Sequence, residues 1–134
     1  MNQADQTLSR IVANIDPMSL NDEYGRLPSD FAYWSEKYAD SKKAFALAKV
    51  DRDITRSRLR MIARETIEVS GKRATESMVD ATVELDPAWL EVKTKEIECE
   101  AESLRIHGVL ESLRAKRDML IQMGAQARAE MKSF

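Results

Sequence analysis

Apolar side chains recur at heptad spacing through the middle of the chain. Counting sevens from Phe31 gives two seam positions, which are aromatic at first, polar around Arg52 and Thr55, and aliphatic afterwards. These seam positions hold Phe31, Trp34, Tyr38, Ser41, Phe45, Ala48, Arg52, Thr55, Leu59, Ile62, Thr66 and Val69. A second apolar stripe consists of Leu47, Val50, Ile54 and Met61. A helix with two apolar stripes needs two sets of neighbours.

Capping residues set the expected limits of this first long helix. Ser29 and Asp30 follow Pro28 directly, and both are good N-caps. Gly71 supplies a C-terminal stop, because glycine readily takes the left-handed conformation that ends helices. The sequence therefore predicts a helix of about 60 Å from Ser29 or Asp30 to about Ser70.

A second long apolar pattern begins after Asp86-Pro87, an N-cap followed by a proline suited to the first helical turn. Its exposed positions interleave Glu with Lys or Arg at helical spacing, which is typical of a solvated face. Gly124 indicates a second helix break, and Thr75 indicates the N-cap of a short connecting helix. The seam holds Trp89, Val92, Cys99, Ile106, Leu110, Leu113 and Leu120, widened by Leu90, Ile97, Ala101 and Leu104.

The first 28 residues have a weaker pattern. A short amphipathic helix is expected where apolar residues fall at helical spacing, at Leu8, Ile11, Val12 and Ile15. Pro17, Gly25 and Pro28 interrupt the remainder, so it is interpreted as a linker with one helical turn at most. Residues 1–28 therefore form an N-terminal arm, and residues 29–134 form the helical domain.

These elements predict an all-α fold, a long antiparallel helical hairpin with a short connecting helix and an N-terminal arm. Two long helices cannot enclose a globular core, so the surplus apolar stripes are expected to pack against other copies of the chain. The aromatic seam residues could stack nucleobases, but at seam spacing they are more often core. The expected interface between copies comprises Trp34, Tyr38, Phe45, Leu110, Leu113 and Leu120.

Composition agrees with a helical protein and limits the cellular setting. The 134 residues carry a net charge of −2, so overall charge does not predict nucleic-acid binding. Cys99 is the single cysteine, which fits a reducing compartment. Neither a signal peptide nor an apolar run near the roughly 20 residues of a membrane span is visible. We expect a soluble intracellular protein without a membrane partner.

Positive charge is concentrated in Lys49–Arg64. This segment contains five arginines, and its only acidic residues are Asp51 and Asp53. Like charges four residues apart destabilise a helix by roughly 0.2–0.5 kcal/mol per pair. The run is either a solvated face or an anion track for a nucleic-acid backbone. The candidate track comprises Arg52, Arg56, Arg58, Arg60 and Arg64, extended after the helix by Lys72 and Arg73.

No catalytic arrangement is visible. His107 and Cys99 are eight residues apart, about 12 Å along a helix, which is too far to share a metal ion. No glycine-rich phosphate loop is present, and the carboxylates are mostly spaced to pair with Lys or Arg. We therefore expect no enzymatic activity, no cofactor and no metal site.

The sequence from Phe31 onward resembles the UvsY-type recombination mediators of T-even-like phages. The shared motifs are an aromatic-Trp pair at Tyr33-Trp34, then Lys42-Lys43, then the basic-x-basic-Leu signature Arg56-Ser57-Arg58-Leu59. A basic loop at Gly71–Ala74, a short helix at Glu76–Leu85 and a long helix from Trp89 follow in the same order. The segment IDPMSLNDEY resembles the N-terminal arm of the family, so the resemblance covers most of the chain.

The resemblance implies a non-enzymatic protein that binds single-stranded DNA as a ring-like homo-oligomer. Such proteins help to load a RecA-like recombinase onto strands coated by single-strand binding protein, here in the cytoplasm of an infected bacterial cell. Arg56 and Arg58 inherit the DNA-contact role by motif match, whereas the other basic candidates follow from charge alone. One departure is Arg60, which stands where the family is not basic.

Arg56 and Arg58 point about 200° apart on a helix, so they cannot share one ridge. The sequence therefore predicts a basic collar, part of it serving subunit contacts and part facing DNA. Two alternatives remain. One is a structural coiled-coil adaptor or virion scaffold whose basic run meets an acidic protein. The other is a chaperone or inhibitor that binds a client through the apolar stripes.

Overall fold

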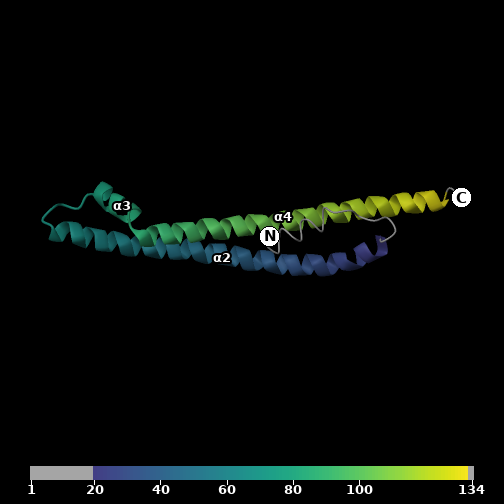
Figure 1. The fold of residues 1–134 in the computed structure, drawn as a ribbon, viewed down its shortest axis with the longest axis horizontal. Coiled ribbons are helices and arrows are strands. Elements are labelled where there is room, and N and C mark those ends of the chain that lie inside the picture. Colours follow the sequence, from purple (N-terminus) through teal and green to yellow (C-terminus); the bar gives the residue numbers. More distant parts are fainter. Residues whose placement is uncertain (1–19, 133–134) are drawn as a thin grey trace. The chain divides into compact units, whose positions relative to one another are not determined.

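The computed structural model describes residues 20–132, and this part of the chain is all-helical. It contains the helices α2 (Leu20–Val69), α3 (Glu76–Glu84) and α4 (Pro87–Lys132), and no strand (Figure 1). The short helix expected around Leu8 lies outside the described residues. The all-α prediction is confirmed for residues 20–132.

Helix α2 begins nine residues earlier than the sequence predicted, at Leu20 instead of Ser29. Pro28 lies inside the helix, where it lacks an N–H to donate to the carbonyl four residues earlier. The prediction is wrong because Pro28 does not end this helix. Burial of Leu27 and the packing of Tyr24 against the same cluster favour a helix that continues through Pro28.

The predicted ends between the helices are confirmed. Gly71, just after α2, has φ +82°, the left-handed conformation expected of a helix stop. The Thr75 side chain accepts a hydrogen bond from the Met78 backbone N–H at 3.3 Å and caps α3. Asp86 Oδ1 accepts from the Ala88 N–H at 2.8 Å, so Asp86 caps α4 directly before Pro87.

The predicted break at Gly124 is wrong, because α4 continues to Lys132. A glycine inside a helix costs only about 1 kcal/mol relative to alanine, which packing can offset. A Cβ added to Gly124 would lie 3.3 Å from the Tyr24 hydroxyl oxygen and 3.9 Å from Leu20 Cδ2. Gly124 therefore gives the first turns of α2 room to pack closely against α4.

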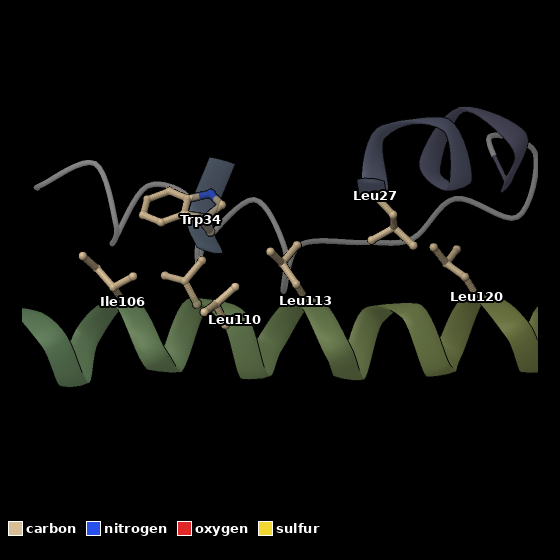
Figure 2. Packing of buried hydrophobic residues seen from close by; sticks show 7 residues of the cluster. Leu27, Trp34, Ile106, Leu110, Leu113 and Leu120 are labelled. Atoms are coloured by element: carbon tan, nitrogen blue, oxygen red, sulfur yellow. The ribbon is translucent and has the colours of Figure 1, made fainter. Parts of the chain in front are cut away.

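The structure divides into two compact units, and each is described separately. Unit 1 comprises, within the described chain, residues 20–40 of α2 and residues 103–132 of α4. Its apolar cluster places Trp34 over Ile106 and Leu110, and Leu27 between Leu113 and Leu120 (Figure 2). Residues of α2 and of α4 thus share the apolar cluster of this unit.

Polar contacts also join the two segments of unit 1. Lys116 pairs with Glu23, and both side chains are largely removed from solvent. Tyr38 lies beside His107 with ring centroids 5.7 Å apart. Loss of either Lys116 or Glu23 would leave the other charge uncompensated and largely out of water, which is strongly destabilising. The Lys116–Glu23 pair therefore favours this register of the two segments.

Unit 2 comprises Ser41–Glu102, which includes the second part of α2, all of α3 and the start of α4. Its buried apolar side chains are small, namely Ala48, Ala63, Val79 and Val83. Its larger aliphatic side chains are mostly exposed: Leu47, Val50, Ile54, Met61, Ile62, Val69, Leu85, Leu90 and Ile97. Unit 2 therefore gains less from apolar burial than unit 1, and its ion pairs matter more.

Four of the six residues expected at an interface between copies lie in the core of unit 1. Trp34, Leu110, Leu113 and Leu120 are each at most 6% exposed, and they pack within the chain. Their burial leaves them almost no surface for a second copy in this conformation. Tyr38 and Phe45 are half-buried.

Leu113 and Leu104 provide a matched test of this core. Leu113 is 0% exposed and Leu104 is 66% exposed on the same helix of the same unit. Leu113→Ala is expected to lower the free energy of unfolding by about 2–5 kcal/mol, because it leaves a cavity. Leu104→Ala should change it far less. Urea denaturation followed by circular dichroism measures both, and equal losses would contradict the assigned core.

Candidate nucleic-acid interface

All seven basic residues predicted to contact DNA lie in unit 2. Five are on α2, and Lys72 and Arg73 are in the connection between α2 and α3. The structure separates the seven into two groups according to their partners. One group is neutralised by carboxylates of the same chain, and the other is open to solvent.

Arg52 belongs to the neutralised group. Its Nη1 donates to Glu96 Oε1 at 2.6 Å, and its Nε donates to Asp53 Oδ1 at 3.1 Å. Glu96 is buried, and Lys93 Nζ lies 3.8 Å from its other carboxylate oxygen. A buried carboxylate is costly unless it is paired. Arg52 therefore joins α2 to α4 within unit 2, in keeping with its seam position.

Arg60 and Arg64 hold α3 against the end of α2. Arg60 donates to both Asp80 and Glu76, and Arg64 donates to Glu76. Burial alone would lower the pKa of Arg60, but the Asp80 and Glu76 carboxylates outweigh it and raise that pKa above its ordinary value. Arg60 is therefore a permanent cation, and its charge is directed at α3.

Four cations remain available. Arg56, Arg58, Lys72 and Arg73 are exposed, and among residues 20–132 none of them forms a hydrogen bond or an ion pair. Each has its full charge to offer to an incoming anion. Arg56 and Arg58 diverge by about 200° around α2, so they face different directions. Within the predicted collar, the cations without a partner in the described chain are therefore two separated arginines and the basic connection.

The aromatic side chains offer little surface for stacking bases. Trp34 is 5% exposed within the core of unit 1, so a nucleobase cannot reach its faces. Phe45 is half-buried, and Lys49 Nζ lies 4.1 Å from its ring centroid. Tyr33, which is exposed, packs edge-on against Trp34 with centroids 5.1 Å apart. The available chemistry is therefore charge and not base stacking.

The remaining candidates for chemistry are isolated. Within the described chain, no group of three or more His, Cys, Asp or Glu side chains could hold a metal ion. His107 lies 3.7 Å from Glu111 on its own helix, and Cys99 is half-buried. None of the helices in residues 20–132 is long and apolar enough to cross a membrane.

Sequence reasoning missed the acidic half of this site. Glu76 and Asp80 are four residues apart and share a face of α3, which is the only trace of their role in the sequence. Their pairing with Arg60 and Arg64 depends on α3 folding back onto α2, over sequence separations of 12 to 20 residues. Heptad counting along a single helix cannot reveal that contact.

Comparisons with protein-family models, with curated proteins and with solved structures find no match to this chain. The resemblance to UvsY-type mediators therefore rests on the sequence motifs alone.

The role of Arg60 can be tested against Arg56, which has no carboxylate partner. Arg60→Ala is expected to speed hydrogen exchange of the α3 amides. The substitution removes the hydrogen bonds that Arg60 donates to Glu76 and Asp80 on α3. Arg56→Ala should leave α3 exchange unchanged. Exchange measured by mass spectrometry on peptides covering Glu76–Glu84 decides between them. Equal protection in the two variants would show that the ion pairs do not hold α3.

Proposed function

We propose that this protein is a non-enzymatic recombination mediator that binds single-stranded DNA. It would act as a ring-like homo-oligomer of antiparallel helical hairpins in the cytoplasm of an infected bacterial cell. There it would help to load a RecA-like recombinase onto strands coated by single-strand binding protein. The loading role and the ring come from the resemblance, and the charge distribution supports the DNA-binding part.

One observation carries the proposal. Arg56 and Arg58, the two residues that match the family signature, are the two arginines of the basic run without a carboxylate partner in the described chain. Arg52, Arg60 and Arg64, which were added from charge pattern alone, are all ion-paired. The absence of a carboxylate partner at the two motif positions, within the described residues, supports the proposal.

The physical basis is phosphate neutralisation by several weak sites. Each cation that contacts a phosphate releases a condensed counterion, which makes binding strongly dependent on salt. Only four of the seven predicted contact residues are free in the described part of the chain, so useful affinity requires several copies on one strand. Little sequence preference is expected, because contacts to phosphates carry no information about the bases.

Removal of both signature arginines tests this proposal. Arg56→Ala with Arg58→Ala is expected to weaken binding to fluorescent oligo-dT. It should also flatten the log–log salt dependence by about 1.4, since each lost phosphate contact on a single strand removes about 0.7. The control is Lys95→Ala with Arg128→Ala, because these cations are also exposed and unpaired among the described residues. Binding that is the same in both double variants would contradict the proposal.

The carboxylates of α3 compete with DNA for two further arginines. Glu76→Gln with Asp80→Asn frees Arg60 and Arg64, so single-strand binding should tighten and the salt slope should steepen by up to about 1.4. Glu84→Gln with Glu91→Gln changes net charge equally at exposed positions without partners in the described chain. Titration of fluorescent oligo-dT with each double variant at several salt concentrations compares their binding. Equal tightening in both would mean that only net charge matters.

A coiled-coil adaptor or virion scaffold is the second candidate. The exposed aliphatic side chains of unit 2 favour it, because a protein partner would cover them while an acidic face met the free arginines. This function predicts no salt-sensitive binding to oligonucleotides.

A further inference from the structure

One face of α2 in unit 2 is apolar and exposed. Leu47, Val50, Ile54 and Met61 are 51–66% exposed at positions i, i+3, i+7 and i+14. Ser57 occupies the remaining position of this heptad stripe. By helical geometry, Met61 lies about 160° around the axis from the buried Ala63. The stripe therefore faces away from the contacts that α2 makes within its own unit.

The stripe carries an unpaired charge pattern along one flank. Asp51 and Arg58 are seven residues apart and fall on the same side of the stripe. Both are exposed, and neither has a hydrogen bond or an ion pair among residues 20–132. An acidic and a basic residue separated by one heptad are complementary to the same segment running in the opposite direction.

We infer that the stripe is the contact surface for the same stripe of a second copy, with the two α2 segments antiparallel. Val50 then faces Met61 of the second copy, and Ile54 faces its Ser57. Asp51 lies beside the second copy's Arg58, and the two-fold symmetry repeats that ion pair at the other end. The contact covers Val50, Ile54 and Met61, which unit 2 leaves in water.

The flanking charges allow only one antiparallel register. A shift of one heptad in one direction places Asp51 opposite Asp51, and the opposite shift places Arg58 opposite Arg58. Both shifts put like charges together, which is unfavourable across a coiled-coil flank. In a parallel pair, Asp51 would instead face Ala46 and Arg58 would face Asp53. Substitution of Asp51 therefore distinguishes the two orientations.

This inference rests on the homo-oligomer in the proposed function and deepens it by naming the surface. An isologous contact closes with two copies, so any larger ring would be assembled from such pairs through another surface. The contact uses no nucleic acid, but it pairs Arg58 with Asp51 of the second copy. Within the pair, Arg58 must therefore give up that contact before it binds phosphate, whereas Arg56, Lys72 and Arg73 stay free. The contact can still stand if DNA binding fails, and it can fail if DNA binding stands.

Charge exchange on the full chain tests it. Asp51→Lys and Arg58→Glu, made singly, are each expected to raise the dissociation constant of the pair roughly tenfold or more, because two attractive contacts become repulsive. The double variant Asp51→Lys with Arg58→Glu should restore pairing to within about threefold of the original chain. Sedimentation equilibrium over a concentration series, without DNA, measures all four proteins.

The control is Glu91→Lys, at an exposed position of α4 away from the stripe, which should leave pairing unchanged. Met61→Ser should weaken pairing without unfolding the chain, because Met61 is 66% exposed. A monomeric parent chain, or a double variant no better than the single ones, would overturn the inference. If Asp51→Lys leaves the dissociation constant of the pair unchanged while Arg58→Glu raises it, the two segments are parallel and not antiparallel.

Discussion

A charge that leaves water must be paired, and in unit 2 this rule applies to Glu96, which is buried and pairs with Arg52. The apolar side chains buried there are alanines and valines, which supply little burial energy compared with the Trp34 and Leu113 cluster of unit 1. Ion pairs take a larger share of the positioning. Arg52 meets Glu96 across to α4, and Arg60 meets Asp80 across to α3. Arg52 and Arg60 therefore form contacts between helices within the unit.

The same rule identifies the residues that remain available for binding. Arg56 and Arg58 have no carboxylate within reach in the described chain, and Lys72 and Arg73 lie in an exposed connection. An arginine already paired with a carboxylate must give up that contact before it binds phosphate, whereas a free arginine gives up only water. Charge counted along the sequence therefore includes arginines that are already paired within the chain, and the proposed single-strand contact relies first on the free cations.

Much of the fold followed from local rules. The stop at Gly71, the Thr75 cap and the Asp86-Pro87 start were all predictable, because each depends on the conformational preference of one or two residues. The helix boundaries predicted at Pro28 and Gly124 are wrong, because local preference does not decide the structure at these two residues. Each is tolerated inside a helix because of tertiary packing, around Leu27 and against Tyr24 respectively. The sequence also could not predict which arginines of the basic run are ion-paired and which are free. That depends on which carboxylates of α3 and α4 lie next to α2.

We propose that free arginines and an uncovered apolar stripe make this chain an oligomer that binds single-stranded DNA. Static light scattering with and without a long oligo-dT tests both parts at once. We expect a mass above that of one chain without DNA, and a further salt-sensitive increase when oligo-dT is added. A protein that stays at the mass of one chain, or that ignores oligo-dT at low salt, would contradict it.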